Sequence, residues 1–294
     1  MRGEPKEHVF TTEGVRLTWF EWGRAGDPQV LLVHATGFHA RCWDRTVAAL
    51  PEGLHAIAVD MRGHGRSDKI GPYNWKTFGR DLEALVRGLA LTDAIGVGHS
   101  MGGHCVTQVA ARVPGAFERL VLVDPVIMGP EAYAAARHQG FAGPEEHPVA
   151  RRRDQWSSWT EMFERFQDRL PFSRWRREVL EDYCRYGVLP DPAGSGWRLA
   201  CPGVVEASIY MGSSETDIHA LIPTVAIPVV VLRARGREPG DMNVMDFSKS
   251  PTWPQLAAEF PNGRDVFLPD HTHFIPMEDP ELVARFIIDG NARP

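Results

Sequence analysis

The sequence predicts an α/β fold, in which a mostly parallel sheet of about eight strands is covered by helices on both faces. Three observations lead to this prediction. Short, continuous apolar runs recur along the 294 residues, as expected for strands that are buried on both faces. Segments with apolar residues three or four positions apart lie between these runs and indicate amphipathic helices. The segment GHSMGG follows one apolar run and leads into a helical one, a pattern typical of a sharp strand-to-helix turn.

The strands follow in chain order. Two runs at residues 8–12 and 16–22 are separated by a turn at residues 13–14, which favours an antiparallel hairpin at the start of the sheet. Six buried runs continue the sheet, at residues 30–33, 56–59, 94–97, 120–123, 229–232 and 266–268.

Two helices between these strands are marked by their spacing. Residues 75–89 place apolar side chains on one face, and Asn74 is positioned to cap the first turn. Residues 101–113 form the second helix, directly after Ser100. The partial positive charge at the N-terminus of this helix favours a negative charge that develops beside it.

Ser100 is the candidate nucleophile, because it occupies the central position of G-x-S-x-G in GHSMGG. Between a strand and a helix, this motif lifts one serine hydroxyl above the edge of a sheet. Gly98 and Gly102 lack a Cβ, so the strand and the helix can approach closely around a serine with a strained backbone. Such a serine needs a base, which in this motif's chain order lies far downstream, after an acid.

Two histidines near the C-terminus compete for the role of this base. His271 and His273 follow the apolar run at residues 266–268, in the segment PDHTHFIPMEDPE. A histidine at the end of a strand can take the proton of the serine hydroxyl and return it to the leaving group. On this ground alone, both histidines remain open.

The chain resembles the α/β-hydrolase family along nearly its whole length, which implies the α/β-hydrolase fold. The resemblance rests on GHSMGG, on LLVHATGF at residues 31–38, on DMRGHGRSD at residues 60–68 and on HFIPMEDPE at residues 273–281. The last segment is similar to the one in which α/β-hydrolases carry their catalytic histidine. This resemblance selects His273 as the base, and leaves His271 as a neighbour that hydrogen-bonds the loop or lines the pocket.

The resemblance also implies an oxyanion hole. LLVHATGF matches the segment whose backbone N–H forms half of this hole, so Thr36 and Met101, the residue after the nucleophile, are the expected donors. Ala35 replaces the usual glycine of this segment, which implies a slightly different turn.

DMRGHGRSD lacks the spacing and the lysine of a phosphate-binding loop. We expect its glycines to shape a tight turn, with its Arg and Asp side chains bonded to the backbone.

The acid of the expected triad has three candidates. Family members most often carry it after the penultimate strand, but that position falls near Arg237 here, in the loop RGREPGDMN. Glu238 or Asp241 serves if this loop is rearranged. The family's second location is the end of the strand after the nucleophile helix, where Asp124 closes an apolar run at the same sheet edge as Ser100. We favour Asp124, because a carboxylate there can accept the imidazole Nδ1–H and fix the tautomer.

The alternation of strands and helices breaks between Asp124 and the penultimate strand. This stretch is rich in aromatic residues, several of them at helical spacing. In the resembled family such an insertion is a helical cap over the catalytic serine, so we expect a core domain of residues 1–125 and 223–294 and a cap of residues 126–222. Each aromatic either packs inside the cap or lines a pocket for a hydrophobic or aromatic substrate portion. For the arginines at residues 151–153, recognition of a substrate carboxylate is the alternative, but we expect a solvated face.

Composition and charge restrict the partners. A formal net charge of -6 argues against nucleic acid, whose phosphates need a basic surface. No apolar stretch reaches the roughly 20 residues of a membrane span, and the first ten residues lack the apolar segment of a secretory signal, so we predict a cytoplasmic protein. The four cysteines and the histidines lack metal-ligand spacing, and we predict no metal and no cofactor. A small-molecule substrate is the expected partner, and nothing in the sequence indicates the oligomeric state.

The implied function is that of a serine hydrolase that cleaves a carboxylic ester or a lactone through an acyl-enzyme. The same motif occurs in carbon–carbon bond hydrolases, so hydrolysis of a diketone-type substrate is the alternative reaction. A catalytically weak, ligand-binding member of the fold is the alternative outside catalysis. Epoxide hydrolases and haloalkane dehalogenases of this fold need a carboxylate nucleophile, and the serine at position 100 argues against both.

Overall fold

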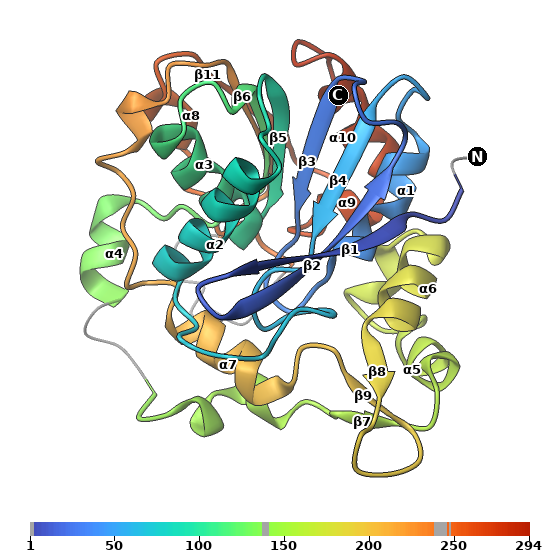
Figure 1. Ribbon diagram of the computed structural model, residues 1–294. Helices are drawn as coiled ribbons and strands as arrows, with labels where there is room; N and C mark the ends of the chain where they lie inside the picture. The colour runs from blue at the N-terminus through green and yellow to red at the C-terminus, as the bar shows by residue number, and fades with distance from the viewer. Residues whose placement is uncertain (1–2, 137–140, 238–245, 247) are drawn as a thin grey trace.

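The computed structural model describes residues 3–136, 141–237, 246 and 248–294. Eight strands form one sheet: β1 (Lys6–Thr12), β2 (Val15–Trp22), β3 (Gln29–Val33), β4 (His55–Val59), β5 (Ala94–His99), β6 (Phe117–Val123), β10 (Val229–Ala234) and β11 (Gly263–Leu268). Their order across the sheet is β1-β2-β4-β3-β5-β6-β10-β11. β2 pairs antiparallel with β1 and with β4, and every other pair of neighbours is parallel. The predicted sheet, with its initial hairpin, is confirmed (Figure 1).

Helices cover both faces of this sheet. One face carries α2 (Trp75–Gly88), α3 (Met101–Arg112) and α8 (Leu256–Glu259), and the other carries α1 (Asp44–Ala48) and α10 (Pro280–Ile288). Two short segments lead into the second group: the 3-10 helix η1 (Ala40–Trp43) and α9 (Ile275–Glu278). Because successive strand residues point to opposite faces, Leu31 belongs to the first apolar core and Leu32 to the second. The predicted layering is therefore confirmed (Figure 1).

The two long helices begin differently. Asn74 Oδ1 accepts a hydrogen bond from Thr77 N at 2.9 Å, which is the N-cap expected from the sequence. Ser100 occupies the N-cap position of α3, but its side chain makes no cap hydrogen bond. A serine at this position usually satisfies the first backbone N–H groups of the helix. Here its hydroxyl is left for another partner.

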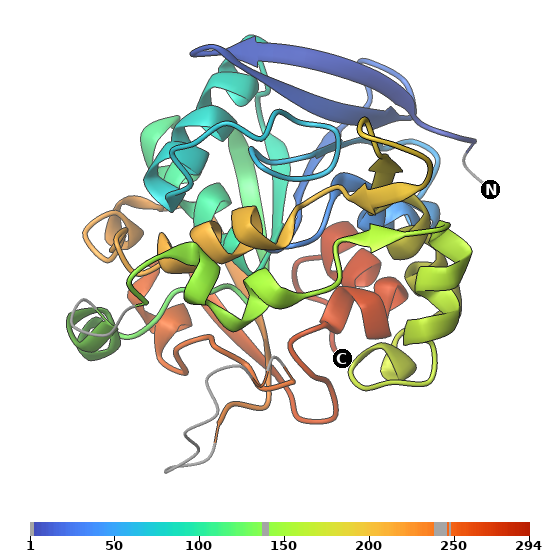
Figure 2. The ribbon, with the colours of Figure 1, turned by 90° about the horizontal axis from the view of Figure 1, so that it is seen from below.

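The chain between β6 and β10 forms a layer at the carboxyl ends of the parallel strands. Its helical elements are α4 (Pro130–Ala136), α5 (Trp159–Phe166), α6 (Arg177–Tyr186), α7 (Gly203–Met211), and the 3-10 helices η2 (Pro144–Glu146), η3 (Pro148–Arg151), η4 (Phe172–Arg174) and η5 (Ile222–Thr224). Figure 2, viewed from below, shows this layer lying across the sheet and its helices.

This layer also contains a small antiparallel sheet, with strand order β7-β9-β8, that the sequence did not predict. Its strands are β7 (Gln155–Trp156), β8 (Val188–Pro190) and β9 (Trp197–Leu199). Strands of two or three residues are too short to show the alternation on which strand prediction depends. The layer therefore contains the expected helices and, in addition, a short sheet.

An apolar core attaches the layer to the rest of the chain. Trp156, Phe163 and Trp175 are buried in it together with Phe38, which follows β3, and Phe274, which precedes α9. All four cysteines of the chain are buried, and none forms a disulfide. Buried free cysteines commonly pack as small apolar side chains. The layer therefore shares its packing with the two loops that flank the end of the sheet.

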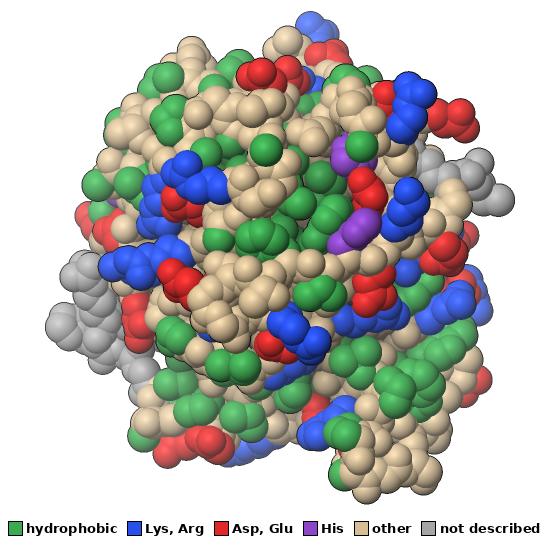
Figure 3. All heavy atoms as spheres, viewed as in Figure 1, with side chains coloured by type: hydrophobic (Ala, Val, Ile, Leu, Met, Phe, Trp, Pro, Cys, Tyr) green, Lys and Arg blue, Asp and Glu red, His purple; other side chains and the backbone are tan. Residues whose placement is uncertain are grey.

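The surface carries charges of both signs. On the face in Figure 3, acidic and basic side chains are interspersed. Within the described ranges, the longest helix is α2, with 14 residues, and none of the helices has the combined length and apolar character that a bilayer-crossing helix needs.

Candidate active site

Ser100 lies in the sharp turn between β5 and α3. Its backbone has φ 56° and ψ −117°, a region that residues other than glycine rarely adopt. The turn brings Gly102 against β3 so closely that a Cβ on this glycine would lie 2.1 Å from the carbonyl oxygen of Val33. The glycine is therefore required by the close approach of the two segments. This geometry is the one expected for the central serine of GHSMGG.

The structure brings Ser100, His273 and Asp124 together, although they lie far apart in the sequence. His273 Nε2 lies 3.0 Å from Ser100 Oγ, and His273 Nδ1 lies 2.6 Å from Asp124 Oδ2. All three side chains are buried, and Asp124 is 0% exposed. A proton on Nδ1 donates to the carboxylate, which leaves Nε2 free to accept the proton of the serine hydroxyl.

The second carboxylate oxygen of Asp124 is also fully engaged. Oδ1 accepts hydrogen bonds from Ala234 N at 2.9 Å and Ser250 Oγ at 2.6 Å, and Thr252 Oγ1, at 3.3 Å, shares its one proton between Oδ1 and the closer carbonyl of Pro125. These donors hold the carboxylate in one orientation and leave Oδ2 for the imidazole. Glu238 and Asp241, the other two candidates for this place, lie outside the described residues.

His273 is fixed through its backbone by a residue that the sequence analysis did not single out. His99 Nε2 lies 2.8 Å from the carbonyl oxygen of His273, to which it donates. Complete burial, together with the neighbouring His273 ring, lowers the pKa of His99 well below its usual value, so His99 is neutral. The sequence did offer a sign of this role, because His99 directly precedes Ser100 within GHSMGG. His271 does not reach this cluster, because its Nε2 lies 3.9 Å from Asp279 on the surface.

The two residues expected to form an oxyanion site lie on different elements, Thr36 on the loop after β3 and Met101 at the start of α3. Thr36 is buried and lines a cavity with Ser100, and Met101 is the first residue of α3. In the described chain, neither of their backbone N–H groups has a protein acceptor. Gly37 turns the loop with φ 80° and donates its N–H to His64 Nε2 at 3.0 Å. Although Ala35 replaces the glycine that is usual in the family, the turn leaves the backbone N–H of Thr36 without an acceptor among the described residues.

The segment DMRGHGRSD has the structural role expected of it. The carboxylate of Asp60 accepts N–H bonds from Ala40 at 2.7 Å and Arg66 at 2.8 Å, and Arg62 forms a buried ion pair with Asp81. His64 Nδ1 donates to a carbonyl of the same segment, and burial lowers its pKa well below the usual value. The neutral imidazole can therefore accept the N–H of the loop that carries Thr36.

Most of the buried histidines form hydrogen bonds with backbone carbonyl groups rather than with other histidines. The carbonyls of Ala35, Tyr183, Arg62, His273 and Thr216 are bonded to His34, His39, His64, His99 and His104, respectively. Across residues 3–136, 141–237, 246 and 248–294, no group of three or more His, Cys, Asp and Glu side chains is placed to hold a metal ion.

A cavity of about 310 Å³ lies directly over Ser100 and His273, between the sheet and the layer that follows β6. Its wall is mainly apolar, and ligand sites commonly combine such a wall with a few polar groups. The aromatic residues that the layer contributes are Phe166, Phe172, Trp175, Tyr183 and Tyr210. Trp156 and Phe163, which the sequence could not distinguish from these, pack in the apolar core without lining the cavity, whereas Trp175 and Tyr183 do both.

Comparison with known proteins supports the architecture. A family model described as the alpha/beta hydrolase family matches residues 30–286, which is most of the chain. The chain belongs to the alpha/beta hydrolase family. It is a hydrolase of this fold, and relatives of similar length are known in several bacteria.

Two relatives show the range of activities near this hydrolase. A bifunctional esterase/perhydrolase of Acinetobacter calcoaceticus is 23% identical, over 96% of this chain and 98% of that protein. A 3-oxoadipate enol-lactonase of Acinetobacter baylyi is 29% identical, over 76% of this chain and 77% of that protein. Among solved structures, an E-2-(acetamidomethylene)succinate hydrolase has a TM-score of 0.74 at 21% identity, covering 97% of this chain and 98% of its own, which shows a shared fold.

The cavity of this hydrolase contains one ion pair. Arg152, at the end of η3, is paired with Glu206 of α7, and Arg152 Nη2 donates to Tyr183 Oη at 3.1 Å. The expected solvated face is correct for Arg151 and Arg153, whose side chains are exposed, but wrong for Arg152. Its carboxylate partner lies 54 residues further along the chain, so the pairing has no local sequence signal.

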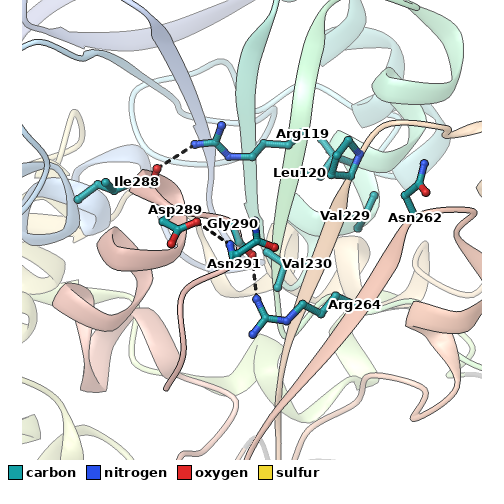
Figure 4. A pocket seen from close by; sticks show the side chains of 11 residues that line it. Arg119, Leu120, Val229, Val230, Asn262, Arg264, Ile288, Asp289, Gly290 and Asn291 are labelled. Atoms are coloured by element: carbon teal, nitrogen blue, oxygen red, sulfur yellow. Dashed lines mark hydrogen bonds between the residues drawn. The ribbon is translucent and has the colours of Figure 1, made fainter.

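A second cavity, of about 300 Å³, lies at the opposite end of the sheet, at the amino ends of β10 and β11 (Figure 4). Its two arginines are bonded to the C-terminal segment: Arg119 donates to the carbonyl of Ile288, and Arg264 to those of Gly290 and Ala292. These side chains therefore hold the end of the chain in place. The cavity contains no residue of the Ser100 cluster.

Proposed function

We propose that this hydrolase cleaves a carboxylic ester or a lactone through an acyl-enzyme, with Ser100 as nucleophile, His273 as general base and acid, and Asp124 as the acid of the triad. The observation that carries the proposal is the continuous hydrogen-bonded chain from Ser100 Oγ through both imidazole nitrogens of His273 to Asp124. A hydroxyl, an imidazole and a buried carboxylate in this order are the parts of a serine-hydrolase relay.

In the first half of the reaction, Ser100 Oγ attacks the substrate carbonyl carbon while His273 Nε2 takes its proton. The N–H groups of Thr36 and Met101 donate to the oxyanion that develops, and each such donor is worth about 3 kcal/mol of barrier. Asp124 remains ionised and stabilises the imidazolium. His273 then gives its proton to the departing alkoxide, and the acyl group stays on Ser100.

In the second half, water replaces the alcohol. His273 removes a proton from the water as the oxygen attacks the acyl carbon, and the resulting tetrahedral intermediate uses the same oxyanion donors. Collapse releases the carboxylic acid and returns the proton to Ser100. With a lactone, the alcohol and the acid released are the two ends of one molecule.

The substrate of this reaction is a small molecule with a hydrophobic or aromatic portion. The cavity over Ser100 supports this class, because seven aromatic side chains line it, five of them from the layer that follows β6, and its volume suits a small organic compound. We assign residues 126–222 as the cap that supplies most of this wall, and residues 1–125 and 223–294 as the core domain that carries Ser100, Asp124 and His273.

A fluorophosphonate probe and a p-nitrophenyl butyrate assay test the proposal together. The probe should label the wild-type protein with one equivalent, and Ser100→Ala should abolish both labelling and hydrolysis, because loss of a triad nucleophile costs around a million-fold in kcat. Ser157→Ala, at an exposed serine of the cap, is the matched control and should retain both. Ester hydrolysis by Ser100→Ala at more than about a hundredth of the wild-type kcat would contradict the assignment. Turnover of a vinylogous diketone but not of the ester would favour the carbon–carbon hydrolase instead.

A further inference from the structure

The ion pair in the cavity is not accounted for by the relay. Arg152 and Glu206 both line the cavity that holds Ser100 and His273, and both come from the cap. The Glu206 side chain is 7% exposed and that of Arg152 is 25% exposed. An ion pair in a largely apolar wall is costly to desolvate, so it adds little stability by itself.

The guanidinium retains donors that no protein group uses. Arginine carries five N–H donors. In the described chain, Arg152 spends one on Glu206 Oε2 and one on Tyr183 Oη. Burial opposes its charge, but the attraction of Glu206 and Tyr183 raises the pKa of Arg152 well above its usual value, and it stays charged. Three N–H groups of Arg152 therefore have no protein acceptor in the described chain, and the residue lines the cavity.

Tyr183 adds a further donor at the same place. Its hydroxyl oxygen accepts from Arg152, so its own O–H is free to donate. Burial raises the pKa of Tyr183 to about 12, which keeps this proton in place at neutral pH. The ring of Tyr183 belongs to the aromatic wall, with Trp175 at 5.4 Å between centroids.

Glu206 places this polar group beside the expected oxyanion loop. A Cβ on Gly37 would lie 2.3 Å from Glu206 Oε1, so the carboxylate rests against the residue that follows Thr36. The polar end of the cavity therefore lies close to where the scissile carbonyl would bind, rather than at the far rim.

The charges of the cavity wall determine which substrate group can bind beside Arg152. Arg152 and Glu206 are the only Lys, Arg, Asp or Glu side chains among the described residues of the cavity wall, and their charges cancel. A substrate carboxylate would share one guanidinium with Glu206, whose negative charge would repel it. Removing a carboxylate from water is unfavourable unless a new opposite charge compensates it. A neutral oxygen acceptor avoids this cost and still receives the unused hydrogen bonds.

We propose that Arg152 and Tyr183 form a subsite that binds an uncharged oxygen acceptor of the substrate, such as an amide, ketone or hydroxyl oxygen near the scissile ester. This proposal rests on the proposed function, because it assigns the substrate class of the same cavity. The aromatic wall holds the apolar part of the substrate, and Glu206 keeps the guanidinium charged and oriented.

Three ethyl esters of equal shape test the subsite: ethyl glutaramate with an amide end, ethyl 5-methylhexanoate with an apolar end, and ethyl hydrogen glutarate with a carboxylate end. A second series carries the same three ends on the alcohol side. In at least one series, the wild-type kcat/KM should be about tenfold to a hundredfold higher for the amide than for the apolar ester, which is the range of one hydrogen bond to a charged donor. The carboxylate should be the poorer of the two polar esters.

The variant pair Arg152→Met with Glu206→Gln removes both charges together, so that no unpaired charge stays buried. The ratio of amide to apolar ester should then fall to about one, while Arg151→Met, at the exposed neighbour, should keep the wild-type ratio. Equal rates for amide and apolar ester in both wild-type series, a preference for the carboxylate, or a ratio that survives the double variant would each overturn the proposal.

Binding measurements separate this inference from the proposed function. Calorimetric titration of the three esters into Ser100→Ala measures selectivity without turnover, and the amide should bind about tenfold more tightly than the apolar ester. If wild type hydrolyses no ester but Ser100→Ala still prefers the amide, the proposed function fails and the subsite stands. If the esters are hydrolysed without this preference, the subsite fails alone.

Discussion

Replacing Asp124 by Asn tests the relay most sharply, because the structure dictates how the amide must lie. Three donors point at Oδ1, and one of them, the N–H of Ala234, cannot turn away. The oxygen of the introduced amide must therefore take the Oδ1 position, and its NH2 group must face His273 Nδ1. The imidazole then carries its proton on Nε2, where it donates to Ser100 instead of accepting.

The size of the loss follows from this constraint. Restoring the useful tautomer would require the amide to flip, which leaves the Ala234 N–H facing an NH2 group and weakens the bonds from Ser250 and Thr252. One unsatisfied buried donor costs about 1–3 kcal/mol, and each weakened hydrogen bond about 1 kcal/mol. Together with loss of the negative charge that stabilises the imidazolium, we expect kcat to fall about ten-thousand-fold, or about 5.5 kcal/mol.

The assay is hydrolysis of p-nitrophenyl butyrate at pH 7 to 8, with thermal unfolding measured on the same samples. Asp124→Asn should unfold as one cooperative transition near the wild-type temperature, since its volume and most of its hydrogen bonds are kept. Glu238→Gln and Asp241→Asn are the matched controls and should change kcat only mildly. A folded Asp124→Asn that keeps more than a tenth of the wild-type kcat would refute the reasoning, as would a ten-thousand-fold loss in either control.

Two further predictions concern the histidines. His273→Ala should match the kcat loss of Ser100→Ala within about tenfold, with no additional loss in the double variant, whereas His271→Ala should lose far less; the reverse order in the same ester assay would move the base to His271. His104 is buried in α3 with its pKa lowered to about 4 by desolvation, so its unfolded form binds a proton first and stability falls as the pH drops from about 6.5 towards 4. His104→Gln should therefore flatten the decline of the free energy of unfolding between pH 7 and pH 5, by about 2 kcal/mol at pH 5, and an unchanged slope in urea titrations would contradict this.

The sheet could be predicted because its signals are local. Each parallel strand is a short apolar run, and Asn74 marks the start of α2 at the residue where the structure has it. The turn at Ser100 is also local, since glycines must stand where β5, α3 and β3 approach one another. Such signals depend only on residues that are close together in the sequence, so the elements that they mark can be predicted without a structure.

The surroundings of Ser100 depend on contacts that no local pattern records. Asp124 and His273 meet because β6 and β11 lie on either side of β10, and the sequence alone left Glu238 and Asp241 as competitors. The direction of Arg152 was misjudged for the same reason, because its partner Glu206 comes from a distant helix. Whether a cap aromatic lines the cavity or packs in the core is likewise set by tertiary packing.

The cap leaves the sheet after β6 and returns at β10, and these two strands are hydrogen-bonded neighbours. The ladder between them is complete without the cap, so natural or laboratory recombination could exchange this whole stretch while the strands keep their register. A recipient would inherit new selectivity together with its old chemistry. One contact limits the exchange, because Glu206 of the cap occupies the space that a side chain at position 37 would need. A donor cap with a bulkier residue at this contact would therefore clash with the loop after β3, unless the two are matched.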